Sequence, residues 1–163
     1  MRPSGLLHPE LLTLAARAGH GDIIVLADAG LKIPLGSWRI DLGLTKGVPS
    51  MIEVLDALLP EVVVESAIIA DEMSSWNPEL HAGVVARVPV ESRRPAHEQF
   101  AKELATRALA YVKTAECTAY ASVALVCGVS YFDEAVAHFE EVQRTRGNVA
   151  IRQQHTAGEE RRR

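Results

Sequence analysis

The sequence predicts a single-domain, layered α/β fold with a mainly parallel central sheet flanked by helices. Residues 23–27, IIVLA, are too short and too β-branched for a helix, and their apolar residues do not alternate with polar ones. Such a run is typical of a central strand buried on both faces, as in parallel sheets. Strand-like runs recur at 62–69 and 122–129, with helical patterns between them. This alternation of helices and strands is typical of an α/β protein.

Two of the expected helices carry clear signals at their ends. Residues 9–18 have leucines and alanines at helical spacing, and Gly19 is expected to form a left-handed cap after them. Residues 50–59 begin with Ser50 and Glu53, which have the spacing of a capping box. The apolar positions of this second segment also form one stripe, so a helix is predicted there.

Weaker patterns complete the expected order of elements. Asn77 and Pro78 form an N-cap and first-turn pair for a short helix toward His81. Residues 97–108 favour a helix by propensity and spacing. The remaining expected elements are a short strand at 39–42, an ambiguous edge strand at 84–95 broken at Pro89, and a strand at 108–112.

The chain is long enough for one hydrophobic core, but its character changes after Gly128. Apolar residues recur at helical spacing from 132 to 142, and about 15 residues at the C-terminus are expected to be frayed or disordered. We therefore expect a domain at 1–130, followed by a C-terminal helix and flexible tail at 131–163.

The composition argues against several classes of protein. The net charge is −4 and aromatic residues make up 5%, so neither a basic surface nor stacking platforms for nucleic acid are expected. There is no signal-peptide pattern and no apolar run long enough to span a membrane. Cys117 and Cys127 lack CxxC spacing, so we expect them to be small core residues of a protein in a reducing compartment. These features predict a cytoplasmic protein without nucleic-acid or membrane partners.

Common catalytic motifs are missing from the sequence. There is no dinucleotide-binding glycine pattern, Walker A loop, Gly-x-Ser-x-Gly elbow or His-Glu-x-x-His pair. The six histidines are too dispersed to name a metal site, although folding could assemble one. The motifs therefore indicate no nucleotide cofactor and name no metal site.

Polar residues beside the apolar elements are the candidate site residues. Asp28 directly follows the run IIVLA, where ligands gather at the carboxyl ends of parallel strands. His20 precedes the same run, and histidine is suited to proton transfer near neutral pH. His97 and Tyr120 lie beside later elements. Each has a structural alternative: a loop or cap residue for Asp28, a helix C-terminal residue for His20, a helix cap for His97 and a rim residue for Tyr120.

A set of short stretches gives these candidates more weight. GHGD at 19–22, ADAGL at 27–31, RIDL at 39–42, KGVPS at 46–50, HEQF at 97–100 and ECTAYA at 116–121 occur in this order. Together they resemble the D-ribose pyranase and L-fucose mutarotase family, and the resemblance covers about residues 5–130. AGL at 29–31 and RIDL at 39–42 are more similar to the ribose pyranase branch than to the fucose branch.

The resemblance implies an RbsD-like α/β isomerase that interconverts ring forms of a free aldose without a cofactor. It implies a ring-shaped homo-oligomer, pentamer or decamer, with sites between neighbouring subunits. The catalytic histidine of the family corresponds to His20, and its sugar-binding residues correspond to Asp28, His97, Tyr120 and Ser122.

The sequence departs from the family pattern at several points. Ser122 occupies the position of an asparagine, so a shorter hydroxyl replaces an amide. Lys113 replaces an arginine, and the segment between His81 and His97 is shortened. The C-terminal segment extends past the end of the family.

The implied chemistry is the opening and re-closing of a hemiacetal. A base takes the proton of the anomeric hydroxyl while an acid protonates the ring oxygen, and His20 is the predicted proton-transfer residue. If residues 20–28 are extended, His20 and Asp28 lie ~26 Å apart, too far for one small sugar. Either the chain bends sharply at Gly21, or the site joins residues of two protomers.

Three other functions stay open at the level of sequence. The first is a mutarotase for fucose or another monosaccharide, with the same chemistry. The second is a non-catalytic sugar-binding or regulatory module. The third is a structural ring protein whose C-terminal helix recruits a partner.

Overall fold

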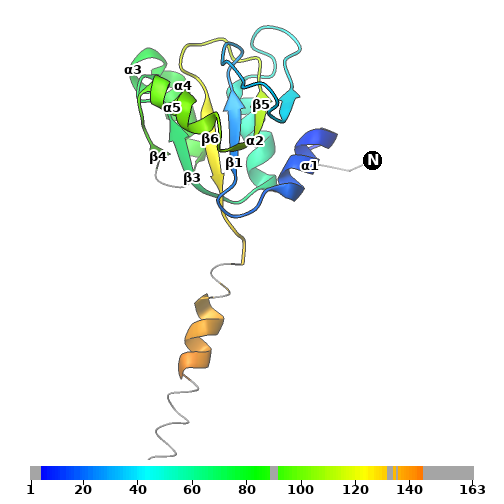
Figure 1. Ribbon diagram of the computed structural model, residues 1–163, viewed down its shortest axis with the longest axis vertical. Coiled ribbons are helices and arrows are strands. Elements are labelled where there is room, and N and C mark those ends of the chain that lie inside the picture. Colours follow the sequence, from blue (N-terminus) through cyan, green and yellow to red (C-terminus); the bar gives the residue numbers. More distant parts are fainter. Residues whose placement is uncertain (1–4, 89–91, 132–133, 135, 145–163) are drawn as a thin grey trace, which may run out of the picture. The chain divides into compact units, whose positions relative to one another are not determined.

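The computed structural model describes residues 5–88, 92–131, 134 and 136–144. The chain divides into two compact units, Met1–Val129 and Ser130–Arg163. In the first unit a central sheet lies between helices (Figure 1). In the second, residue 134 and residues 136–144 are helical, as their apolar spacing predicts. The predicted disorder of the C-terminal tail falls on residues outside the described ranges.

The sheet of the first unit has six strands in the order β2-β5-β1-β6-β3-β4. β6 runs antiparallel to its neighbours β1 and β3, whereas the other three strand pairs are parallel. The prediction of a mainly parallel sheet is therefore confirmed. The strands are β1 (Ile23–Ala27), β2 (Arg39–Asp41), β3 (Val64–Ile69), β4 (Ser92–Arg93), β5 (Ala108–Lys113) and β6 (Val123–Cys127).

Alternate residues of the buried strands face two separate cores. Ile24 and Leu26 of β1 pack into the larger core with apolar residues of four helices, α1, α2, α3 and α4. Ile23 and Val25 pack into the smaller core, which α5 covers through Phe100. Helices on both faces explain why β1 has no polar alternation: all five of its residues are buried. The helices are α1 (Pro9–Arg17), α2 (Met51–Leu58), α3 (Met73–Trp76), α4 (Pro78–Arg87) and α5 (His97–Leu104).

The helix ends confirm one signal and correct another. Ser50 and Glu53 form the predicted capping box at the start of α2. The prediction of a left-handed cap at Gly19 is wrong, because α1 ends at Arg17 and its C-cap residue, Ala18, has extended backbone. The left-handed glycine is Gly21, which has a φ of 81° and turns the chain into β1.

Three other boundaries differ from the expected ones. α4 continues past His81 to Arg87, because Leu80 and Val84 supply a buried face beyond its first turn. The edge strand β4 begins only at Ser92, after Pro89, which lies outside the described residues. α5 ends at Leu104 instead of 108, since Ala108 already pairs with Ile23 in the sheet.

Candidate functional site

Four of the five predicted site residues meet at one end of the sheet, beside the carboxyl end of β1. Asp28 follows the carboxyl end of β1, and Tyr120 and Ser122 lie in the connection between β5 and β6. His97 is the first residue of α5. Three of them line a cavity of about 740 Å³, whose walls are residues 28–32, His97, Ala101 and residues 116–120. The fourth, Ser122, is buried behind Asp28, with 2% of its surface exposed.

The carboxylate of Asp28 is fixed by two hydrogen bonds. The hydroxyl of Ser122 donates to Oδ2 at 2.6 Å, and the backbone N–H of Gly30 donates to Oδ1 at 2.9 Å. The backbone N–H of Asp28 in turn donates to the Ser122 hydroxyl at 3.0 Å. Each carboxylate oxygen accepts more than one hydrogen bond, so Asp28 keeps acceptor capacity toward the cavity for a sugar hydroxyl.

His97 and Tyr120 form an aromatic wall of the same cavity. Their rings meet edge to face with centroids 5.1 Å apart, and Trp76 packs edge to face on Tyr120 at 5.6 Å. Tyr120 is also strained, because its φ of 55° lies in the left-handed region. Non-glycine residues in this conformation are concentrated at binding and active sites. The edge-to-face contacts hold the Tyr120 ring beside His97.

The backbone and ring of His97 have different environments. Its N–H donates to both carboxylate oxygens of Glu72, at 3.0 and 3.1 Å, which fixes the start of α5. This bond from the His97 backbone holds the pKa of Glu72 below its ordinary value of 4.5. The ring Nδ1 is buried without a hydrogen-bond partner within the described part of the chain. A buried unpaired nitrogen beside a cavity is suited to a polar ligand or a bound water.

Glu116 organises the loop that carries Tyr120, a role that the sequence motif did not assign to it. Its Oε1 accepts hydrogen bonds from the N–H groups of Cys117 and Thr118 and from the Thr118 hydroxyl. Partial burial alone raises the pKa of Glu116, but the bonds from Thr118, Met51 and Cys117 hold it below its ordinary value of 4.5. The loop is therefore closed around an ionised carboxylate at neutral pH.

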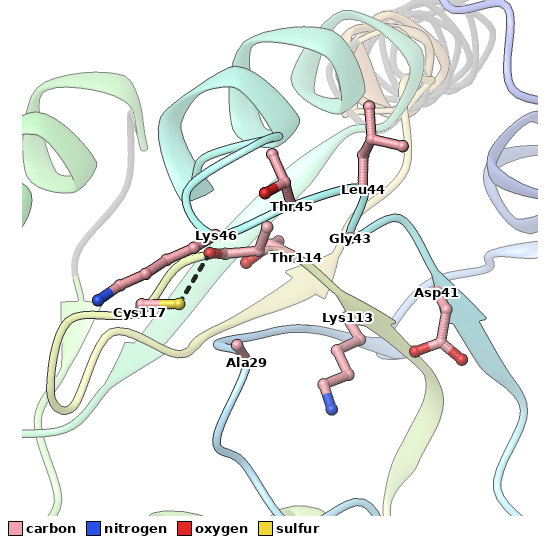
Figure 2. A pocket seen from close by; sticks show the side chains of 10 residues that line it. Ala29, Asp41, Gly43, Leu44, Thr45, Lys46, Lys113, Thr114 and Cys117 are labelled. Atoms are coloured by element: carbon pink, nitrogen blue, oxygen red, sulfur yellow. Dashed lines mark hydrogen bonds between the residues drawn. The ribbon is translucent and has the colours of Figure 1, made fainter.

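A second cavity of about 370 Å³ lies beside the first and shares Ala29 and Cys117 with it. Figure 2 shows Asp41 at the end of β2 and Lys113 at the end of β5 on its walls. Asp41 is already paired with Arg39 at 2.7 Å. None of the predicted site residues lines this cavity, so the first one is the candidate site.

His20 lies at the opposite end of the sheet, before the amino end of β1. The turn before β1 carries it, and the backbone N–H of Gly21 donates to the carbonyl of Cys127, the last residue of β6. Ser122, which contacts Asp28, precedes the first residue of the same strand. The left-handed turn at Gly21 therefore leaves His20 at the amino end of β1. Within one protomer, the structure does not bring His20 to Asp28. The His20 side chain is 58% exposed.

Within the described ranges, no group of three or more histidine, cysteine or acidic residues is placed to hold a metal ion. Among the same residues, no helix is long and apolar enough to cross a membrane. Both cysteines are free thiols, and Cys127 is buried as expected, whereas the expectation of a core residue is wrong for Cys117, which is exposed.

The fold and the cavity define a class: an α/β protein with a polar, aromatic-walled cavity at the carboxyl edge of its sheet. The RbsD / FucU transport protein family matches residues 1–130. The chain belongs to this family.

Individual relatives are similar over most of the chain. A D-ribose pyranase of Geobacillus thermodenitrificans is 44% identical over 134 residues, which are 80% of this chain and 99% of the relative. A D-ribose pyranase of Klebsiella pneumoniae is 36% identical over 140 residues, 80% of this chain and all of the relative.

Solved structures agree with this assignment. RbsD of Bacillus subtilis, solved in complex with D-ribose, has a TM-score of 0.75 and 36% identity, covering 79% of this chain and 98% of that one. A fucose mutarotase of Streptococcus pneumoniae, with a TM-score of 0.53 and 23% identity, shares the fold over 75% of this chain and 93% of its own.

Proposed function

We propose that this chain is a D-ribose pyranase-type isomerase, which interconverts the pyranose and furanose forms of a free aldose. One observation carries the proposal: Asp28, His97 and Tyr120 line a single cavity in a chain that is 36–45% identical to D-ribose pyranases. The ribose-bound relative supports the same class of ligand. The reaction needs proton transfer alone, and no cofactor is part of the proposal.

In this scheme the cavity binds the sugar and His20 moves the protons. Asp28 accepts hydrogen bonds from sugar hydroxyls, and His97 and Tyr120 bind the other polar groups of the ring. An imidazole takes the proton of the anomeric hydroxyl as the bond between the anomeric carbon and the ring oxygen breaks. The ring oxygen receives a proton, and re-closure on a different hydroxyl gives the other ring form. General acid and base catalysis typically accelerates such steps by ~10²–10⁴-fold.

The position of His20 supports a site shared between subunits. β1 and β6 separate the turn of His20 from Asp28, with His20 beside Cys127 and Asp28 beside Ser122. We propose that a neighbouring copy of the chain supplies His20 to the cavity, in a closed ring of identical subunits. Such an interface is heterologous, because one end of the sheet meets the opposite end of the sheet in the next copy. Heterologous interfaces form closed rings when the rotation between copies closes.

The domain boundary and the compartment belong to the same proposal. The match to the family ends at residue 130 and the first compact unit ends at Val129. We propose that residues 1–130 contain the complete catalytic domain, and that a protein ending at residue 130 keeps its exchange rate. A reducing cytoplasm is the compartment that fits the free thiols of Cys117 and Cys127.

Saturation-transfer NMR on D-ribose tests the function directly. Irradiating a pyranose signal is expected to reduce the furanose signals in the presence of the protein, and much less so in its absence. L-Fucose and other aldoses in the same assay separate the pyranase from a mutarotase that exchanges only anomers. Binding by calorimetry without faster exchange of any sugar would contradict catalysis and favour a binding module.

A further inference from the structure

The exposed His20 ring has one specific side-chain partner. Its Nε2 lies 2.9 Å from Oε2 of Glu65, a residue 45 positions later in the sequence. Both side chains are more than half exposed, at 58% and 56%. Within the described residues, no other side chain forms a hydrogen bond with the imidazole of His20. Glu65 therefore lies beside the predicted proton-transfer group, at the opposite edge of the sheet from the sugar cavity.

Glu65 reaches His20 because it occupies an irregularity in β3. Val64 pairs with Cys127 and Ser66 pairs with Val126, so two successive β6 residues face positions two apart on β3. Glu65 is the extra residue of this bulge. Bulges redirect side chains and are frequent next to active sites. At the same place Gly21 bonds to Cys127, so the turn of His20 and the bulge of Glu65 are fixed to the same end of β6.

Gly128 provides the space that the bulge needs. A Cβ atom added at Gly128 would lie 3.3 Å from Cβ of Glu65 and 3.3 Å from Cγ1 of Val63. These distances are tighter than ordinary van der Waals contact, so a side chain at this position would displace Glu65. The bulge, the glycine and the turn together hold the carboxylate at the imidazole.

We propose that Glu65 is a positioning residue for His20, which rests on the proposed function. A carboxylate only accepts hydrogen bonds, so it selects the imidazole tautomer with hydrogen on Nε2. Nδ1 then carries the lone pair that takes the proton of the anomeric hydroxyl, and the same nitrogen returns a proton to a sugar oxygen. The carboxylate also faces the imidazolium that exists between these two transfers, as in other histidine bases held by an acidic residue.

The experiment compares Glu65→Ala, Glu65→Gln, His20→Ala and the double variant in the NMR exchange assay with D-ribose. We expect Glu65→Ala to lower kcat about tenfold with KM changed less than about twofold, because the sugar cavity is intact. Glu65→Gln keeps an acceptor oxygen but loses the charge, and an intermediate rate is expected. Glu79→Ala, which removes an exposed carboxylate of α4, is the matched control and keeps the rate of the unaltered protein.

Non-additivity distinguishes positioning from a structural effect. If Glu65 acts through His20, its removal costs nothing further in the His20→Ala protein. A readout independent of activity is the long-range ¹H–¹⁵N spectrum of His20, which is expected to show hydrogen on Nε2 in the unaltered protein and mixed tautomers in Glu65→Ala. Thermal unfolding checks that each variant is folded. If Glu65→Ala does not fold, Glu65→Gln replaces it in the comparison.

The outcomes separate this inference from the function it rests on. An unaltered protein that does not accelerate exchange of any aldose contradicts the proposed function. An active protein that loses its activity in His20→Ala but keeps it in Glu65→Ala overturns the positioning role alone. Equal losses from Glu65→Ala in the presence and absence of His20 also overturn it.

Discussion

Ser122 and Asp28 lie 94 residues apart in the sequence and are joined by two hydrogen bonds, one between side chains at 2.6 Å and one from the Asp28 backbone N–H at 3.0 Å. The resemblance assigned Ser122 to sugar binding. In the structure its hydroxyl donates to the Asp28 carboxylate, and Ser122 is buried. We therefore expect Ser122 to act on the sugar through the orientation of the Asp28 carboxylate.

Removal of the Ser122 hydroxyl is the first test. Ser122→Ala leaves one buried carboxylate oxygen and one backbone N–H without this partner, which is expected to cost about 1–3 kcal/mol of unfolding free energy. Sugar affinity is expected to fall roughly tenfold, because only the backbone N–H of Gly30 then holds the Asp28 carboxylate. Thermal unfolding and titration by NMR measure the two effects. Ser37→Ala, at a hydroxyl that has no hydrogen-bond partner among the described residues, is the control; equal effects of the two substitutions would contradict the role of Ser122.

The Tyr120 hydroxyl is expected to bind the sugar. Tyr120→Phe keeps the ring, and with it the edge-to-face contacts to Trp76 and His97. The loss of one hydrogen bond is expected to weaken binding by about 0.5–1.5 kcal/mol without a change in stability. Calorimetric titration with the sugar measures this loss. Tyr131→Phe is the matched control, because Tyr131 is 62% exposed and outside the first unit. Unchanged sugar affinity in Tyr120→Phe would show that the Tyr120 hydroxyl does not bind the sugar.

The Glu116 carboxylate is expected to make the stability of the folded protein depend on pH. Its pKa is below the ordinary value of 4.5 in the folded protein, where hydrogen bonds from Thr118, Met51 and Cys117 outweigh partial burial. Its stabilising contribution is therefore fully present above that ordinary value and is lost as the pH falls through the lower, folded value. Glu116→Gln is expected to lower the melting temperature at pH 7 and to reduce its dependence on pH between about 5 and 3.

Melting temperatures across this pH range measure the effect of Glu116. Glu79→Gln removes an exposed carboxylate of α4 and is the control, with a profile like that of the unaltered protein. A Glu116→Gln protein that is equally stable at pH 7, or that loses stability in acid as steeply as the unaltered protein, would contradict the role of this carboxylate.

The turn that carries His20 depends on Gly21. A Cβ atom added there meets no atom within 4 Å, so Gly21→Ala tests backbone strain without a clash. Its φ of 81° is expected to make the substitution cost about 1–2 kcal/mol of unfolding free energy. Gly43→Ala is the control, because a Cβ there makes only ordinary contacts and its φ is not left-handed. Denaturant unfolding that gave both variants the same stability would show that the turn is not strained.

Local signals in the sequence were sufficient for most of the fold. The run IIVLA predicts β1 with its exact bounds, and Ser50 and Glu53 predict the start of α2, because both features depend on neighbouring residues. Strand direction is not local. Nothing in residues 123–127 distinguishes an antiparallel strand in the centre of the sheet from a parallel one, since both are buried on both faces.

The candidate site could be predicted only in part for the same reason. The position of Asp28 after β1 predicts a place at the carboxyl end of the parallel strands, and in the structure Asp28 lines the cavity there. The pairing of Glu65 with His20 depends on a bulge between β3 and β6, and no pattern around residue 65 predicts it. The hydrogen bonds of Glu116 also depend on how a loop closes after folding.

In the proposed assembly, His20 of one copy completes the sugar cavity of another. The most direct test co-expresses the His20→Ala and Asp28→Ala chains with different tags and isolates the mixed assembly. Each variant alone is expected to keep only a small residual rate, because every cavity lacks one of the two groups. In a random mixture, about a quarter of the interfaces combine an intact His20 with an intact Asp28, so about a quarter of the exchange rate on D-ribose is expected to return. A mixed assembly as inactive as its two parents would contradict the shared site.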